Sequence, residues 1–232
     1  MKKATPFTII LMVTASLSAA DSPRDTLVAA ARKLATSDNY SWKILSEAGP
    51  HFEGKTEKDG FTLVNITDGS LTLSKGTNAA FKPPDGEWQS VADTFSGDAN
   101  GDVKIAAFRA LMNTPFPPAQ EIEALVEQLG NITVAKGVYS STLTEESAKH
   151  FAPLSYYRLV FGRAGNLMVT GTKGSARFWI TDGLLTKIEL PVQGELHSMQ
   201  GLQEINRTAT TTFKDIGNTK VELPDEAKKK VS

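Results

Sequence analysis

Short apolar and β-branched runs, separated by turn residues, recur along the chain and predict strands. The pattern is clearest in residues 174–180 and 184–190, which flank Asp182-Gly183. Asp and Gly tolerate the positive φ angles of a type I′ turn, so these two segments predict a β-hairpin. Residues 207–215 follow, and their threonines favour a third strand. The C-terminal part is therefore predicted to be an antiparallel sheet of consecutive strands.

The same pattern organises the first third of the chain, where Asp59-Gly60 and Asp68-Gly69 mark two further turns. Turns that recur about every 8–12 residues are typical of an antiparallel sheet. Residues 156–171 remain ambiguous because glycines interrupt their apolar runs. The other predicted strands are residues 40–45, 52–57, 61–66, 71–75, 78–82, 87–90, 132–135 and 138–143.

Helical periodicity appears in three longer segments, residues 24–36, 102–112 and 119–129, and in a short one, residues 144–151. Ser22 and Pro23 suit the N-cap and first position of the first helix. Each long helix has one apolar stripe, which needs a partner surface. The helices are therefore expected to lie on the sheet.

The first twenty residues have the features of a secretory signal peptide: Lys2 and Lys3, an apolar stretch over 7–15, and small residues up to Ala20. Cleavage is expected after Ala20, and a bulky residue there should impair it. Residues 21–232 are then predicted to form a single domain. No other stretch approaches the ~20 apolar residues of a membrane helix. The mature protein is therefore expected to be periplasmic or secreted, soluble, monomeric and without a stable membrane anchor.

Composition narrows the function further. The chain has no cysteine, hence no disulfide and no site for an N-terminal lipid anchor. Loss of Lys2 and Lys3 reduces the basic residues from 25 to 23 against 26 acidic ones, a net charge of −3 that disfavours nucleic-acid binding. The histidines, His51, His150 and His197, lie far apart and predict no metal site.

Sequence motifs for catalysis are weak. The loop from Asp98 to Asp102 resembles the start of a calcium-binding loop, but Val103 and Arg109 stand where that loop needs Gly and Glu. A solvated acidic loop is the better interpretation. No nucleophile motif such as G-x-S-x-G occurs. We therefore expect no catalytic residue and no cofactor.

Phe178 and Trp179 are adjacent in a predicted strand, so their side chains must point to opposite faces of the sheet. Two explanations remain open. Either helices cover the second face, or one face leaves an apolar groove with room for an acyl chain.

The order of elements resembles the half-open β-barrel proteins of the bacterial envelope, the LolA/LppX/LprG-like superfamily. The matching motifs are residues 85–88 (Asp-Gly-Glu-Trp), 180–188, 210–217 and the ending 221–227 with its Pro-acidic tail. The resemblance implies an α+β fold, with a strongly curved antiparallel sheet, or half-barrel, and helices on its concave face. The chain departs from the mycobacterial branch because it lacks the lipobox cysteine.

The resemblance also implies a function: a soluble exported protein that binds a lipid or an acylated protein partner in an apolar groove without catalysis. The alternatives are an envelope interaction protein with a filled core and no ligand, and, less favoured, a hydrolase. Phe116, between prolines at 115, 117 and 118, is expected to form a stiff lip over the groove or to plug the core. The residues expected to line the groove are Leu111, Phe116, Ile122, Leu125, Val126 and Phe178.

Overall fold

The structure is a computed structural model that describes residues 22–47, 51–58, 60–76, 78–96, 118–151, 168–198 and 201–232. Within these residues, eleven strands form one antiparallel sheet in the order β6-β5-β4-β3-β2-β1-β11-β10-β9-β8-β7. The strands are β1 (Asn39–Ser46), β2 (Phe52–Glu57), β3 (Phe61–Ile66), β4 (Leu71–Lys75), β5 (Asn78–Lys82), β6 (Gln89–Ser90), β7 (Thr133–Ala135), β8 (Val138–Thr142), β9 (Met168–Thr181), β10 (Leu184–Ser198) and β11 (Gly201–Lys214).

The sheet consists of two meanders, which are joined by pairing between the first and the last strand of the chain. The first runs from β1 to β6 and the second from β7 to β11, and β1 pairs with β11 in antiparallel register. The predicted turn at Asp182-Gly183 is confirmed, since both residues have positive φ, 53° and 70°. These are the angles for which Asp and Gly were expected there.

Five helices occur among the described residues: α1 (Pro23–Ala35), α2 (Val91–Ser96), α4 (Pro118–Gln128), α5 (Glu145–Phe151) and α7 (Asp225–Lys229). The predictions of helices over 24–36, 119–129 and 144–151 are confirmed to within one residue. The predicted helix over 102–112 lies outside the described residues. α2 and α7 were not predicted.

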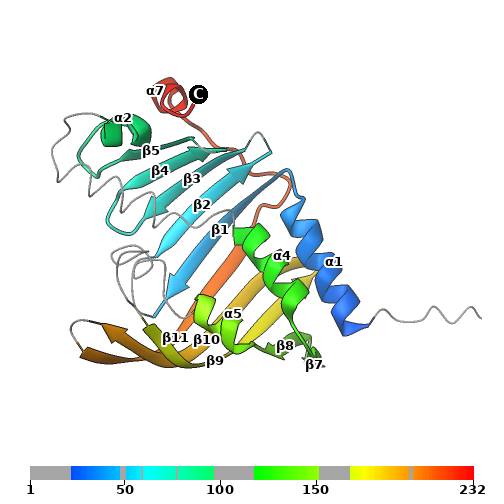
Figure 1. Ribbon diagram of the computed structural model, residues 1–232. Coiled ribbons are helices and arrows are strands. Elements are labelled where there is room, and N and C mark those ends of the chain that lie inside the picture. The colour runs from blue at the N-terminus through cyan, green and yellow to red at the C-terminus, as the bar shows by residue number, and fades with distance from the viewer. Residues whose placement is uncertain are drawn as a thin grey trace, which may run out of the picture.

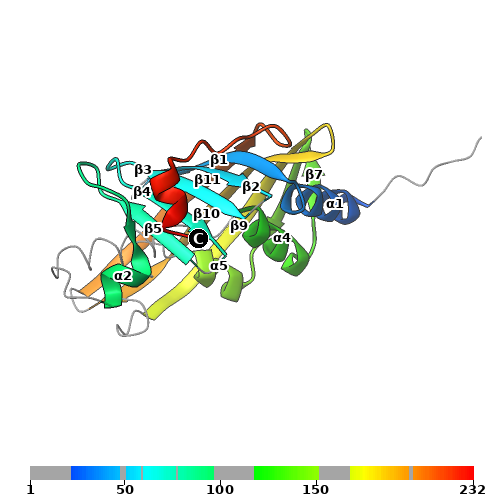
Figure 2. The ribbon, with the colours of Figure 1, turned by 90° about the horizontal axis from the view of Figure 1, so that it is seen from above.

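The sheet is strongly curved and open (Figure 1), and α1, α4 and α5 lie inside the curve. α1 packs against β9 and β10, and α5 packs against the same two strands. The view from above in Figure 2 shows α1, α4 and α5 grouped on one side of the strands. The fold class predicted from the sequence, a half-barrel with helices on the concave face, is confirmed.

The strand register assigns every residue to one of two faces, because side chains alternate along a strand. In β1, Tyr40 and Trp42 point to the inner face, toward the helices, and Ser41 and Lys43 point to the outer face. The pairing of Trp42 with Gly54 and with Phe213 continues the inner face into β2 and β11.

The inner face and the helices α1 and α4 share the larger apolar core. Polar contacts lock the two helices together at its edge. Arg24 donates hydrogen bonds to the backbone oxygens of Leu129 and Glu127, which lie at the C-terminal end of α4. Arg32 makes ion pairs with Glu123 and with Glu127 at 3.4 and 3.2 Å. An arginine at a helix C-terminus satisfies carbonyl groups that have no partner in the helix.

A second, smaller core lies on the outer face, over β3 to β5. Leu73 and Ala80, which are neighbours across β4 and β5, are fully buried there by Ala227 and Val231 of the C-terminal segment. The ending 221–227 resembles a final strand with a Pro-acidic tail. In the structure residues 221–224 are not in a strand, so that part of the prediction was wrong. The charged tail contains α7, which buries an apolar side between its charges.

The strands β9, β10 and β11 are longer than predicted. The predicted strand over 184–190 ended before Pro191, a residue type that is rare inside a sheet. In the structure β10 continues through Pro191, which pairs with Thr208, and a register shift follows between Gln193 and Glu195. The sheet thus extends well past the ends of α4 and α5 (Figure 1).

Candidate binding face

Apolar residues also occur on the inner face beyond the strands against which α1 and α5 pack. In β2 to β5 its positions include Phe52, Val64, Ile66 and Phe81, all buried. Sequence reasoning did not single out these residues as part of a site. The signal from alternation was weak. It is clear only in residues 52–57, where Glu53, Lys55 and Glu57 mark the outer face, because residues 61–66 carry apolar side chains on both faces.

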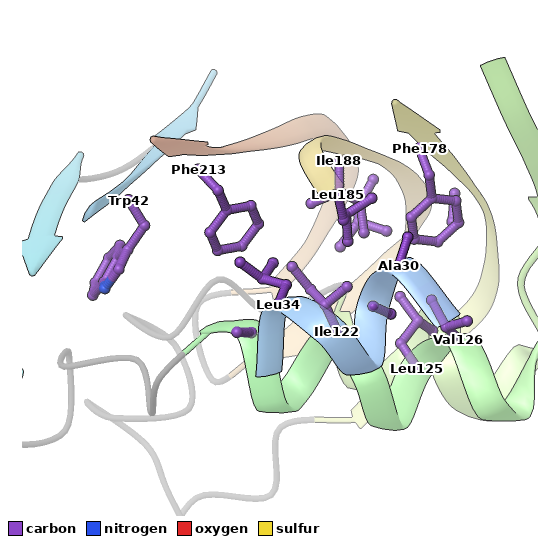
Figure 3. Close-up of a cluster of buried hydrophobic side chains, with 14 of the residues drawn as sticks. Ala30, Leu34, Trp42, Ile122, Leu125, Val126, Phe178, Leu185, Ile188 and Phe213 are labelled. Carbon is purple, nitrogen blue, oxygen red and sulfur yellow. The ribbon is translucent and has the colours of Figure 1, made fainter. Parts of the chain in front are cut away.

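Four of the six predicted groove residues meet in one cluster (Figure 3). Ile122, Leu125 and Val126 extend from α4 toward the sheet, and Phe178 approaches from the inner face of β9. Their exposed fractions are 4%, 3%, 0% and 0%, so they are packed against protein. A role of these four in ligand binding remains a prediction. Leu111 and Phe116 lie outside the described residues.

Trp42 packs closely on the neighbouring strand of the inner face. Its indole lies over Gly54 of β2, and a Cβ atom at that position would come within 2.2 Å of the ring. The indole Nε1 donates a hydrogen bond to the Thr56 hydroxyl at 3.3 Å. Gly54 is therefore required for space, and the ring covers the backbone of the neighbouring strand.

Hydroxyl groups interrupt the apolar inner face at Tyr40, Thr56 and Thr62, and β4 adds Thr72 and Ser74 to the same face. The Thr62 hydroxyl donates to the Thr56 hydroxyl at 3.4 Å, and the Tyr40 phenol is hydrogen-bonded to Thr56 and to the backbone of Ala119 in α4. Burial raises the pKa of the Tyr40 phenol above its ordinary value of 10.0, and the two hydrogen bonds oppose that shift. The phenol stays neutral at physiological pH and links β1 to the first turn of α4.

The outer face of the long strands is polar. Lys43 forms an ion pair with Glu53 across β1 and β2, and Glu189 contacts both Arg177 and Lys187. The Lys187 ammonium also lies 4.4 Å from the centre of the Trp179 ring.

The two adjacent aromatic residues of β9, Phe178 and Trp179, point to opposite faces of the sheet. Phe178 points into the inner core, while Trp179 is half-buried on the outer face beneath the aliphatic and charged atoms of Lys187. A helix covers the outer face at β3 to β5, as the second core shows. At Trp179 the outer face is covered by the Lys187 side chain instead of a helix.

Two hollows lined by described residues lie away from the inner face. The first, of about 450 Å³, lies over the outer face of β1, β2, β3 and β11. The second, of about 480 Å³, lies between α2 and α7, with Asp93, Glu226 and Lys229 among its walls.

Thr170, His197 and Glu195 lie close together and have the residue types of a catalytic relay. The Thr170 hydroxyl lies 3.0 Å from Nε2 of His197, and a Glu195 carboxylate oxygen lies 3.9 Å from the same nitrogen. A relay needs the hydroxyl and the carboxylate on different ring nitrogens, so that one orients the base for the other. Both partners share one nitrogen here, and the ring is 43% exposed. The arrangement is therefore that of a surface histidine.

In the part of the chain that the structure describes, no three His, Asp or Glu side chains gather in a way that could hold a metal ion. None of the described helices has the length and apolar character needed to cross a membrane. The loop from Asp98 to Asp102 lies outside the described residues.

Comparison with known proteins finds likeness only in structure. No family model and no curated protein matches the sequence. Among solved structures, the fold is similar to the lipoprotein LppX of Mycobacterium tuberculosis, with 10% identity, a TM-score of 0.42, and coverage of 87% of this chain and 98% of the other. It is also similar to LprF from Mycobacterium bovis, with 13% identity, a TM-score of 0.47, and coverage of 88% and 97%.

Both likenesses concern the fold alone. With TM-scores below 0.5 and such low identities, they carry no information about the ligand or the role of this chain. A function must therefore be inferred from the residues of the sheet itself.

Proposed function

We propose that the chain is a non-catalytic binding protein that holds a lipid, or the acyl chain of a protein partner, against the inner face of its half-barrel. The observation that carries the proposal is the extent of the apolar inner face. α1 and α5 pack against β9 and β10, whereas apolar inner residues occur beyond those strands, at Phe52 of β2, at Val64 and Ile66 of β3 and at Phe81 of β5. Thr72 of β4 lies between Val64 and Phe81 on this face. An acyl chain is the ligand that matches a long, apolar, concave wall.

The energetics of such binding rest on excluding water. Each methylene that leaves water contributes about 0.8 kcal/mol, so about a dozen buried methylenes provide roughly 10 kcal/mol before the costs of association. The hydroxyl groups of Tyr40, Thr56 and Thr62 can orient an ester or a headgroup. No reaction step is needed for this role.

The predicted groove residues keep a place in this proposal. Ile122, Leu125 and Val126 on α4, with Phe178 on β9, form the packed end of the apolar wall. The acyl chain is proposed to lie alongside this cluster. Leu111 and Phe116 are proposed as further contacts on the evidence of the sequence alone.

The alternative is an interaction protein with a filled core and no ligand. It is favoured by the full burial of Val64 and Phe81, at 0% and 1% exposure, in the absence of any ligand. The two functions differ in what the purified protein should contain.

The proposed function also includes export of the protein from the cytoplasm. We infer that residues 1–20 act as a cleaved leader and that residues 21–232 work as one domain outside the cytoplasm. This inference rests on the sequence of the leader. The mass of the protein isolated from the cells that produce it would show whether the leader has been removed.

Native mass spectrometry tests the binding function. We expect the purified protein to carry an additional mass of several hundred daltons, on the order of one lipid, that organic solvent releases. Ile66→Trp, which adds bulk to the inner face, should reduce the retained mass. Leu45→Trp, at an outer position that is 40% exposed, serves as the control and should not. A parent protein with no retained mass and no binding of a fluorescent fatty acid would favour the filled-core alternative.

A further inference from the structure

The outer-face hollow has the size of a small-molecule site. Its volume of about 450 Å³ falls within the range of about 300–1,000 Å³ that is usual for ligand pockets. It lies on the opposite side of the sheet from the face proposed to bind lipid. Its polar side chains come from neighbouring strands, namely Ser41, Lys43, Glu53, Lys55, Asn65, Thr212 and Lys214.

The lining of the hollow carries more positive than negative charge. Three ammonium groups, Lys43, Lys55 and Lys214, face one lining carboxylate, Glu53, which is already ion-paired with Lys43. Asp215, next in sequence to Lys214, accepts a hydrogen bond from Ser41 at 2.9 Å. Three lysines against one glutamate give the lining a net charge of +2, whereas the whole chain carries −1.

Lys55 and Lys214 are the cations in this hollow that remain available. Within the described residues, Lys55 has a single polar contact, to the backbone oxygen of Lys220 at 3.4 Å, and Lys214 has no ion pair. That contact places the Lys55 ammonium beside the C-terminal segment. Leu63 supplies an apolar wall between these polar groups.

We propose that this hollow binds the phosphate ester of a small polar molecule, with Lys55 and Lys214 on the phosphate oxygens. Ammonium groups make the strong, charge-assisted hydrogen bonds that phosphate oxygens accept. Thr212 and Asn65 can bond the hydroxyl groups of the esterified alcohol, and Leu63 can contact its carbon chain. The same chemistry is presented by a free phosphate ester and by a phospholipid headgroup at a membrane surface.

Titration calorimetry with glycerol 3-phosphate and with inorganic phosphate tests the site at low ionic strength. We expect saturable binding that weakens as salt is added, because the lysines are exposed. The double variant Lys55→Ala/Lys214→Ala should bind about tenfold more weakly, having lost two charge-assisted contacts. Lys173→Ala, an exposed lysine on the outer side of β9, is the matched control and should bind like the parent.

A third variant tests the charge argument without removing a donor from the phosphate. Glu53→Gln removes the one carboxylate of the lining and frees Lys43, so phosphate should bind several-fold more tightly. Unchanged or weaker binding in this variant, with the midpoint of thermal unfolding preserved, would overturn the assignment of the hollow.

Vesicles distinguish the two sources of phosphate. Association with phosphatidylglycerol vesicles, lost in the Lys55→Ala/Lys214→Ala variant and absent with phosphatidylcholine vesicles, would identify a headgroup site. Binding of soluble glycerol 3-phosphate without vesicle association would identify a small-molecule site. If neither probe binds, or if both bind the double variant as tightly as the parent, the proposal is wrong.

Discussion

The inner and outer cores lie on opposite faces of one sheet but differ in how they are closed. The inner core is covered by two helices of 13 and 11 residues that are fixed to each other by Arg24 and Arg32. The outer core is covered by a helix of five residues near the C-terminus. A region with few buried contacts opens at lower cost than a large core does. The outer core is therefore expected to open first, and the inner core to set global stability.

The largest expected effect is at the centre of the inner core. Phe178→Ala removes a fully buried ring between β9 and the helices, and should lower the free energy of unfolding by about 3–5 kcal/mol. Trp179→Ala is the matched control, because its ring lies on the outer face beneath Lys187, and should cost much less. Urea unfolding measures both. Equal costs would show that the two faces are not packed as differently as the structure indicates.

Removal of residues 225–232 should have a smaller and more local effect. The truncation loses the burial of Ala227 and Val231 against β4 and β5, worth about 2–3 kcal/mol. Amide exchange should rise in β4 and β5 and stay slow in β9 and β10. Lys229→Ala, which changes an exposed charge of α7, should alter neither. Faster exchange across the whole sheet would mean that the two cores unfold together.

The packing of the Trp42 ring on Gly54 can be tested at the edge of the inner core. Gly54→Ala places a Cβ atom 2.2 Å from the indole and should cost about 1–3 kcal/mol. In a Trp42→Ala background the same change should cost almost nothing, because the clashing ring is gone. Additive costs in this double-mutant cycle, measured by urea unfolding, would contradict the packing of Trp42 on Gly54.

The smallest expected effect depends on pH and concerns the Tyr40 phenol. Tyr40→Phe should cost about 0.5–1.5 kcal/mol near neutral pH through its lost hydrogen bonds. The raised pKa means that the folded protein holds the phenolic proton more tightly than the unfolded chain does. Stability from this group is therefore complete below pH 10 and falls as pH rises above it. The advantage of Tyr over Phe should shrink there, as unfolding at pH 8 and pH 10.5 would show.

Local sequence signals predicted most of the elements because those signals act over a few residues. Asp182-Gly183 fixed a hairpin, and Ser22 with Pro23 fixed the start of α1, where the Asp25 backbone N–H bonds the Ser22 hydroxyl. The curved sheet followed from the resemblance to a superfamily. The ends of strands were predicted least accurately where a strand continues through an unfavourable residue, as β10 does at Pro191.

The outer core could not be predicted from local pattern. Ala227 and Val231 stand among charged residues, and their partners Leu73 and Ala80 lie about 150 positions earlier. The apolar outer positions of β3 and β4, including Leu63 and Leu71, were a visible sign that this face is covered. What covers them depends on the path of the last residues, which no short-range signal specifies. The outer-face hollow was missed for the same reason, since its lysines come from separate strands.

The central claim is that an acyl chain lies on the inner face, and photo-crosslinking tests it most directly. The protein would be incubated with a fatty acid carrying a diazirine near the middle of its chain, irradiated, digested and analysed by mass spectrometry. We predict adducts on inner positions such as Phe52, Ile66 and Phe81, which excess unlabelled fatty acid removes. Adducts confined to outer positions such as Leu45 and Leu202, or no adduct that competition removes, would contradict the account.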